Sequence, residues 1–426
     1  MQKRFWKWGA LGVSIVLLGS AFWYFFSRAG MDATPPAAPK TGVLSPHVPA
    51  LLPALLPPSA DSGPEPQLER IFAAIEGYHL DRAMQLTEGL ILRYPNFRLA
   101  YLIKGDLFLA RAQPLSAFGA AQNAPADRVA DLREEAFVRL QGYKNRPAAD
   151  AVPRYLLQLR DDQRYAIIVD TRKARLYLYQ NDQGRPRLVS DYYVTQGKLG
   201  AEKTAEGDKR TPVGVYHITS HLPREKLADM YGHGAYPLNY PNEWDRAQGR
   251  GGSGIWLHGT PSDTFSRPPK ASDGCVVLAN PDFDRLGDTV QIGLTPVIIT
   301  NGIEWLAPDV WQQERDELKA RIDLWRADWE SMDVERYLAH YSPAFQGKGQ
   351  TYAQFAGQKR QVNRGKSWIN LRLEQLSVFR NPGAEEVAVV SFEQLYDSNN
   401  LSNRMQKRQY WRKEQGRWKI VYEGAA

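Results

Sequence analysis

The chain has 426 residues, and only one of them is a cysteine, so an internal disulfide is excluded. Its 54 basic and 47 acidic side chains leave a net charge of +7, a modest excess for this length. Together with the export signal described next, this balance excludes nucleic acid as an expected partner. The excess either attracts an exported protein to anionic wall or membrane surfaces or serves solubility alone.

An uncharged run, residues 9–26, follows three basic residues near the N-terminus. Its 18 residues are just long enough to cross a bilayer at about 1.5 Å per residue. The positive-inside rule places residues 1–8 in the cytoplasm and the chain after the run outside. A cleaved signal peptide is the alternative, but bulky aromatic residues stand at 23–26, where cleavage requires small ones. We therefore expect a single-pass anchor in the inner membrane, with the folded domains in the periplasm.

Residues 27–67 form a proline-rich linker, with ten prolines between positions 31 and 67. Proline fixes φ and lacks the amide donor that helices and sheets need, so we expect this segment to be extended. A short apolar stretch within it, residues 51–56, is either a docking motif or part of the spacer.

Residues 68–150 carry apolar residues at helical spacing, interrupted by a Tyr-Pro-Asn break at 94–96. The segment resembles one tetratricopeptide-type helix pair followed by one or two further helices. One pair is too short for an independent solenoid, so we expect a small helical module packed beside the next domain. A peptide-binding groove is the alternative.

Residues 151–307 change to the alternating or β-branched pattern of short strands. The predicted strands cover residues 165–170, 174–179, 188–195, 213–218 and 297–300. Short strands separated by turns predict a mostly β domain, either a sandwich or barrel-like. Long connections in compact domains are usually functional, so residues 219–254 are interpreted as a lid over a cleft, with a surface loop as the alternative.

Cys275 ends the polar segment Ser272-Asp273-Gly274-Cys275 and precedes an apolar run. The pair His258-Gly259 ends another apolar run, with the histidine 17 residues before the cysteine. The thiolate is the attacking form of cysteine, so a lone thiol near an imidazole indicates a nucleophile and its base. Taken alone, a free cysteine is more often a small buried hydrophobic residue.

The pattern His-Gly, spacer, Ser-x-Gly-Cys resembles the active-site signature of the L,D-transpeptidase catalytic domain, or YkuD family. A second segment, residues 207–216, is similar to the G-x-x-x-TP-x-G-x-F/Y sequence of that family. The resemblance covers residues 160–302 and implies a mostly β catalytic domain.

The resemblance implies that Cys275 is the nucleophile and His258 its base, with the Gly259 carbonyl holding the imidazole in one tautomer. The N–H groups around Gly274 and Cys275 are the oxyanion-hole candidates, because glycine lets the backbone turn tightly there. We expect the thiol to be more acidic than that of a free cysteine. We also expect its sulfur to lie within about 4 Å of a ring nitrogen, directly or after a rotamer change.

Two positions depart from the commonest family pattern: Asp273 replaces a second histidine, and Val277 replaces an arginine. A carboxylate near the thiol raises the thiol pKa, although Asp273 has alternative roles as a partner of His258 or as an organiser of the loop. Without the arginine, another cation is needed to meet a substrate carboxylate or carbonyl. The substrate-binding candidates are Ser272, Asp273, Arg210, Tyr240, Asn242 and Arg250, with Lys209 as a further replacement for the arginine.

Residues 308–426 begin with apolar residues at helical spacing and continue with four alternating strands at 369–379, 386–396, 404–412 and 417–423. Val334, Tyr337, Leu338 and Tyr341 extend the helical spacing of the first half. The arrangement resembles a cone of the nuclear-transport-factor-2 (NTF2) type, in which the aromatic residues form either the core or a ligand cradle. The segment has no nucleophile–base pair, so we expect it to fold by itself and to position a substrate or a partner.

These features predict a multidomain α+β protein with an anchor, a helical module, a mostly β L,D-transpeptidase-type domain and an NTF2-like cone. The resemblance implies peptidoglycan stem peptides as substrates, cut after diaminopimelate, with an amine or water as acceptor. An outer-membrane lipoprotein and other wall enzymes are further candidate partners. The alternatives are a wall amidase that releases attached lipoprotein, favoured by the missing arginine, and a catalytically silent wall-binding scaffold. No metal or other cofactor is predicted, because His217, His221 and His233 are scattered around turns.

Overall fold

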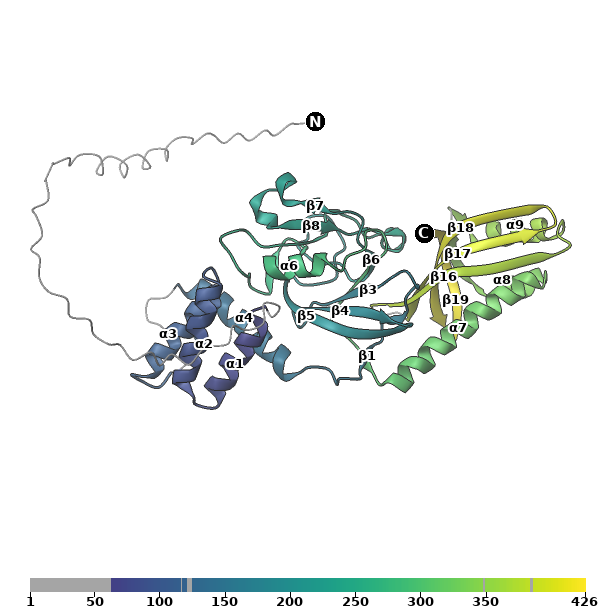
Figure 1. Ribbon diagram of the computed structural model, residues 1–426. Helices are drawn as coiled ribbons and strands as arrows, with labels where there is room; N and C mark the ends of the chain where they lie inside the picture. The colour runs from purple at the N-terminus through teal and green to yellow at the C-terminus, as the bar shows by residue number, and fades with distance from the viewer. Residues whose placement is uncertain (1–62, 116, 121–124, 348, 384–385) are drawn as a thin grey trace, which may run out of the picture. The chain divides into compact units, whose positions relative to one another are not determined.

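The computed structural model describes residues 63–426, apart from 116, 121–124, 348 and 384–385. The predicted anchor at 9–26 and nearly all of the linker lie outside these residues. Within the described part, no helix combines the length and the apolar character that crossing a membrane requires. Helices come first along the chain, then a large mixed sheet, then a second sheet with its own helices (Figure 1).

The N-terminal helices form where helical spacing predicted them. They are α1 (Glu65–Glu76), α2 (Leu80–Arg93), α3 (Arg98–Ala110) and α4 (Ala126–Lys144). Helix α1 begins before the predicted boundary at Leu68, because proline is well tolerated in the first turn, where N–H groups have no intrahelical partner. The helices share one apolar core that includes Leu68, Ile71, Leu90, Leu99 and Ile103. The likeness to a tetratricopeptide pair stays a prediction.

The central sheet has ten strands and confirms the predicted change to β structure. The strands are β3 (Tyr165–Asp170), β4 (Arg175–Asp182), β5 (Arg185–Gly197), β6 (Gly214–His217), β7 (Leu222–Pro223), β8 (Gly234–Pro237), β9 (Trp256–His258), β10 (Lys270–Ser272), β11 (Val276–Leu278) and β12 (Pro296–Thr300). Their order is β6-β12-β3-β4-β5-β11-β9-β8-β7, and β10 pairs with β5. Strands from distant parts of the sequence, β5, β11 and β9, are therefore neighbours.

The long connection at 219–254 is folded and adds to the sheet. It contains β7, two 3₁₀ turns (Arg224–Lys226 and Asp229–Tyr231), β8 and helix α5 (Glu243–Ala247). Strand β8 pairs with β9, so the connection lies directly beside the strand that carries His258. Helix α6 (Asn280–Gly287) follows β11 and packs on the sheet through Phe283 and Leu286.

Both faces of the central sheet are buried, which explains why β3 is apolar along nearly its whole length. Ile167 and Val169 enter one core together with Leu257 and Val276, while Ala166 and Ile168 enter another. Side chains alternate across a strand, so a strand that is covered on both sides needs apolar residues at consecutive positions.

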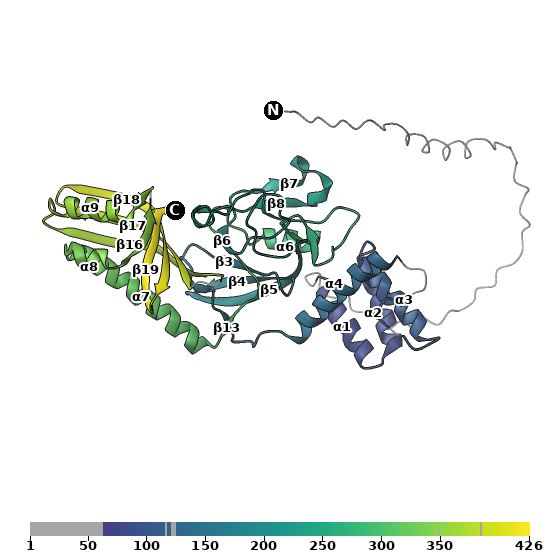
Figure 2. The same ribbon diagram turned by 180° about the vertical axis from the view of Figure 1, so that it is seen from behind.

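The C-terminal part confirms the predicted order of helices followed by long strands. It contains α7 (Pro308–Glu330), α8 (Val334–Leu338), β14 (Tyr341–Gly347), β15 (Gln350–Thr351), α9 (Tyr352–Asn363), β16 (Ile369–Asn381), β17 (Val387–Ser398), β18 (Leu401–Glu414) and β19 (Arg417–Ala425). Tyr341, which continued the helical spacing, instead begins a strand. Helices α7 and α8 run along the sheet in both views (Figures 1 and 2), and their apolar side chains share one core with it.

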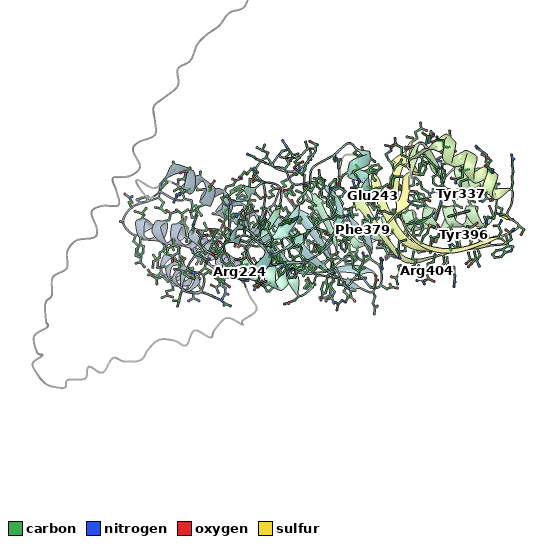
Figure 3. The ribbon with its side chains drawn as sticks, turned by 90° about the horizontal axis from the view of Figure 1, so that it is seen from above. Arg224, Glu243, Tyr337, Phe379, Tyr396 and Arg404 are labelled. Atoms are coloured by element: carbon green, nitrogen blue, oxygen red, sulfur yellow. The ribbon has the colours of Figure 1, made fainter. Side chains whose placement is uncertain are left out.

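The other face of the C-terminal sheet packs against the central sheet. Val378, Val390 and Trp411 point into the helix-covered core, whereas their strand neighbours Phe379 and Tyr410 enter a second core. This second core joins residues of the two sheets: Ala166, Ile168, Tyr177, Tyr179 and Ile298 with Phe379, Val387, Val389, Tyr410 and Val421. Polar contacts accompany it, because Arg408 of β18 donates to the Glu243 carboxylate at 2.9 Å; Glu243 and Phe379 are labelled in Figure 3.

A strand from before the central sheet also joins the C-terminal sheet. Strand β2 (Leu156–Gln158) pairs with β16 and completes the order β15-β14-β19-β18-β17-β16-β2. Strand β1 (Val152–Pro153) pairs with β13 (Trp305–Leu306) just before α7. A boundary at 307/308 therefore cuts through a sheet and a shared core, and the expectation that the C-terminal residues fold by themselves is not supported.

A cavity of about 250 Å³ lies inside the C-terminal part. Tyr337 of α8 and Tyr396 of β17, both labelled in Figure 3, line it. Lys407 of β18 also lines it and forms an ion pair of 2.8 Å with Glu423. The aromatic residues belong to the core and also line this cavity, and their role as a ligand cradle stays a prediction.

Candidate active site

The pairing of β9 with β11 brings the two signature residues to neighbouring strands. The strands run parallel, with Val276 opposite Leu257 and Val277 opposite His258. Side chains two residues apart along a strand point to the same face, so this register places Cys275 and His258 on one face of the sheet. The predicted distance between the sulfur and a ring nitrogen stays a prediction.

The imidazole of His258 is buried and held in one tautomer. Its Nδ1 lies 2.7 Å from the carbonyl oxygen of Gly259, which can only accept, so Nδ1 carries the proton and Nε2 carries the free electron pair. The contact is the one expected of the Gly259 carbonyl, and its part in catalysis stays a prediction. The Tyr231 ring, from the 219–254 connection, packs edge-on at 5.1 Å from the imidazole. One side chain of that connection therefore contacts the histidine, and its role as a lid stays a prediction.

Asn280, the first residue of α6, fixes the turn that follows the histidine. Its side-chain oxygen accepts from the main-chain N–H groups of Thr260 and His233, both at 3.1 Å, and its amide donates to the Thr260 carbonyl at 2.9 Å. A Cβ on Gly259 would lie 2.1 Å from that oxygen, so only glycine fits there. The glycine at position 259 therefore allows the Asn280 side chain to approach the turn closely.

The loop before the cysteine is held by Ser272 and Thr211. The Ser272 hydroxyl donates to the Cys275 carbonyl at 2.6 Å and accepts from the Gly274 N–H at 3.1 Å, which agrees with the predicted loop-orienting role. Thr211, from the Thr-Pro segment, donates to the Gly274 carbonyl at 3.0 Å. The two sequence signatures therefore meet at Gly274, whose φ of +128° also requires glycine.

The N–H of Gly274 is already used, which corrects part of the predicted oxyanion hole. Because this N–H donates to Ser272, it is not free to stabilise an oxyanion in this conformation. The main-chain N–H of Cys275 is the remaining candidate of the two.

The thiol of Cys275 is partly buried, and its hydrogen donates to the Gly254 carbonyl at 3.3 Å. Burial raises the pKa of this thiol, and the Asp273 carboxylate raises it further, while Lys203 and Arg267 lower it. The expectation of an unusually acidic thiol is therefore wrong. The loop that positions the sulfur also removes it from water, and this disfavours the charged form.

The pKa of His258 is lowered, so its imidazole is unprotonated near neutral pH and able to accept a proton. Burial lowers this pKa to about 4, the Gly259 carbonyl opposes the change, and Arg267 adds to it. Both members of the pair are consequently neutral near neutral pH. The arrangement favours proton transfer during attack over a preformed thiolate–imidazolium pair.

Arg267 influences both signature residues, since its charge lowers the pKa of His258 and that of Cys275, the latter less than Lys203 does. It lies in the connection between β9 and β10, and its Nη2 donates to the Met230 carbonyl at 3.5 Å. Sequence reasoning missed it, because the segment between the two signatures was treated as a polar spacer. Its position between the base and the nucleophile in the chain is the signal that was available.

The Asp273 side chain contacts Lys198. Its side chain is 71% exposed and forms an ion pair of 3.1 Å with Lys198. Two alternative roles were predicted for Asp273, partner of His258 and organiser of the loop. The observed contact links the cysteine loop to the end of β5 and is therefore of the second kind. Its effect on the thiol pKa has the predicted sign.

The other predicted substrate-binding residues make contacts within the protein. Arg210 donates to the Ala201 carbonyl at 2.9 Å, and Arg250 pairs with Asp245 at 3.3 Å. Tyr240 is buried and donates to the Gly251 carbonyl at 2.8 Å. Asn242 is buried and caps helix α5 by accepting from the Asp245 N–H at 2.9 Å. Their contact with a substrate stays a prediction, and Val277, in place of the family arginine, is a core residue with 2% exposure.

The described residues contain no group of three or more His, Cys, Asp or Glu side chains arranged to hold a metal ion. Two of the histidines considered in the sequence have other contacts. The His221 ring stacks on Tyr236 with centroids 4.9 Å apart, and His233 lies 2.8 Å from the Asp284 carboxylate.

Two family models match the chain. Residues 164–299 match the L,D-transpeptidase catalytic domain, and residues 317–424 match the Cds6 C-terminal NTF2-like domain. The matches confirm both resemblances read from the sequence. No curated protein sequence matches the chain.

Several solved structures are similar to about two thirds of this chain. Bd1075 from Bdellovibrio bacteriovorus is 27% identical, with a TM-score of 0.59, over 65% of this chain and 98% of that one. The helical cell shape determining protein Pgp2 from Campylobacter jejuni is 24% identical, with a TM-score of 0.54, over 64% of this chain and 95% of that one. A variant of Pgp2 gives 23% identity and a TM-score of 0.54, over 70% of this chain and 100% of that one. The Pgp2 structures show a shared fold.

Proposed function

We propose that this chain, which carries an L,D-transpeptidase catalytic domain and an NTF2-like domain, is a cysteine acyltransferase that acts on peptidoglycan stem peptides. The family match supports the reaction class. One observation carries the assignment of the residues: Cys275 and His258 share one face of paired strands, and Nδ1 of the imidazole is committed to Gly259, which leaves Nε2 to accept a proton.

The first half of the proposed reaction forms a thioester. The thiol turns from the Gly254 carbonyl and gives its proton to Nε2 of His258 as the sulfur attacks the diaminopimelate carbonyl of the donor. The N–H of Cys275 stabilises the oxyanion. When the peptide bond breaks, the leaving amine of the terminal D-residue takes the proton from the imidazolium.

The second half returns the enzyme to its starting state. An acceptor amine attacks the thioester carbonyl and loses a proton to His258, and the sulfur then leaves and recovers that proton. A diaminopimelate side-chain amine as acceptor gives a 3→3 cross-link, and a lipoprotein lysine gives wall attachment. The Tyr231 ring over the imidazole limits the access of water to the base, which favours an amine.

The experiment that tests this proposal uses purified full-length protein, isolated muropeptides and mass spectrometry. The wild type is expected to convert tetrapeptide stems into cross-linked or otherwise acylated products, and Cys275→Ala to give none. A carbapenem is expected to acylate the wild type and not Cys275→Ala. Absence of both adduct and product from a folded wild type would instead favour the silent wall-binding scaffold.

Hydrolysis is a second candidate, and the buried Val277 favours it. The chain lacks the arginine that relatives carry there, so its handling of donor and acceptor differs from theirs. With water as acceptor, the same thioester yields a shortened stem or a released lipoprotein. Running the muropeptide reaction in H₂¹⁸O separates the two outcomes, because only hydrolysis places ¹⁸O in the new carboxylate.

We further propose that the reaction takes place in the periplasm, with the chain held at the inner membrane by residues 9–26. The sequence pattern of those residues supports this location, as does the position of the stem-peptide substrate outside the cytoplasm. An outer-membrane lipoprotein and other wall enzymes remain proposed partners.

A further inference from the structure

The segment between the catalytic signatures, residues 259–272, is fixed on both sides of Arg267. Phe265 is buried between the rings of Tyr94 and Phe97, at centroid distances of 4.9 and 4.7 Å. The Ser266 hydroxyl donates to Glu135 of α4 at 2.7 Å. The N-terminal helices therefore hold the chain immediately before Arg267.

The backbone of Arg267 is fixed from the sheet as well. Its carbonyl accepts from the Tyr193 hydroxyl at 2.8 Å and from the Thr195 hydroxyl at 3.1 Å, both on β5. With the main chain held at these points, the side chain is the part of this residue that is able to adjust to a ligand.

The guanidinium of Arg267 is close enough to His258 and Cys275 for its charge to lower the pKa values of both. It donates to the carbonyl of Met230, and the next residue, Tyr231, packs against the imidazole of His258. Within the described part of the chain, no carboxylate lies within ion-pair distance of Arg267. Burial lowers the pKa of this guanidinium, while Asp273 and Cys275 raise it. A half-buried guanidinium that no carboxylate pairs with directly is suited to bind an anion.

We infer that Arg267 binds a carboxylate of the peptide acyl donor. The inference rests on the proposed function for the identity of the donor. Stem peptides offer two carboxylates near the scissile bond: one on the D-centre of diaminopimelate and one on the terminal D-alanine. The planar guanidinium suits either as a bidentate partner.

The first test needs no turnover, because Cys275 is the only thiol of the chain. Alkylation by anionic iodoacetate is compared with alkylation by neutral iodoacetamide on the full-length protein. The ratio of the two rates cancels any change in thiol pKa, since both reagents require the same thiolate. Arg267→Gln is expected to lower this ratio by about fivefold or more, because a cation that attracts the anionic reagent is lost.

Two further variants serve as matched controls for this test. Arg267→Lys keeps the charge and is expected to retain most of the ratio. Lys270→Gln removes a cation from the same segment, one that pairs with Glu134 at 3.5 Å, and is expected to change the ratio by less than about twofold. An unchanged ratio in Arg267→Gln, or an equal fall in Lys270→Gln, would overturn the inference.

The second test identifies the carboxylate. Tetrapeptide donors with a carboxamide at the D-centre, at the C-terminus or at neither position are compared in KM and kcat. Wild type is expected to lose affinity for only one of the amidated donors, and Arg267→Gln to treat that donor and the unmodified one alike. If the wild type turns over no donor while the alkylation ratio still depends on Arg267, the proposed function fails and the anion site stands.

Discussion

At the residue scale, the neutral state of the Cys275–His258 pair determines how activity depends on pH. The base must be unprotonated to accept the thiol proton, and burial lowers the pKa of His258 to about 4. We expect the rate of acylation to fall only as the pH drops through about 4, well below the ordinary histidine value of about 6.5. The pH profile of kcat/KM measures this, and an acid limb near 6.5 would contradict it.

The same shift predicts a dependence of stability on pH. The folded-state pKa of His258 lies below its unfolded value, so between about pH 6.5 and 4 the unfolded chain binds a proton that the folded chain does not. The contribution of His258 to stability is therefore unchanged above this window and is lost as the pH falls through it. Denaturant unfolding at pH 7 and pH 4.5 is expected to show a smaller loss of stability in His258→Gln than in the wild type. An equal loss in both proteins would place the relevant titration elsewhere.

Sequence reasoning singled out Cys275 and His258 as the proposed reacting groups because they lie in short, recognisable motifs. A single cysteine and a His-Gly pair are visible in the sequence itself. The contact between the His258 ring and the Gly259 carbonyl is also local, because it joins adjacent residues. The contacts of Thr211 with Gly274 and of Asn280 with Thr260 depend on which strands become neighbours, and no local pattern encodes that pairing. Arg267 was missed for the same reason, since its nearness to the pair arises from long-range packing.

At the element scale, the segment 259–272 couples the N-terminal helices to the site. We expect Phe265→Ala to lower kcat/KM by about 10- to 100-fold, because small displacements of positioned groups strongly reduce rates. The side chain is 4% exposed, so the substitution also costs about 3–5 kcal/mol of stability.

A matched variant separates these two effects. Ile71→Ala removes a fully buried side chain from the same helical core without touching the segment, and it is expected to lower the melting temperature with little change in kcat/KM. If both variants lose activity in proportion to their stability, the helices serve the fold and not the site.

The strands were predictable where alternation was strong, as in residues 369–379 and 417–423. The three-residue strands β9 and β11 were not predicted by pattern, because so few residues carry too little periodicity. Their positions followed instead from the motifs that they carry. Tyr341 shows the opposite case, since apolar spacing continued past the end of α8 and gave no sign of the turn before β14.

At the scale of the whole molecule, the two sheets depend on each other. Removing residues 309–426 would uncover Ile168, Tyr177, Tyr179 and Ile298, none more than 4% exposed. At about 1.5–3 kcal/mol for each side chain, the loss is comparable with the whole stability of a typical domain. We expect the truncated protein to aggregate or to melt far below the full-length chain. A cooperative transition at an unchanged temperature in scanning calorimetry would show that the central part is independent.

Neighbouring residues of strand β18 make contacts on opposite faces of the strand. Lys407 pairs with Glu423 in the cavity of the C-terminal part, whereas Arg408 meets Glu243 on the opposite face. Because side chains alternate strictly along a strand, the loss or gain of one residue would exchange the two rows. Lys407 would then point away from Glu423 and the cavity, and Arg408 would point into the cavity and away from Glu243. Among descendants of this sequence, β18 is therefore free to change by substitution within each row but not by insertion or deletion of a single residue.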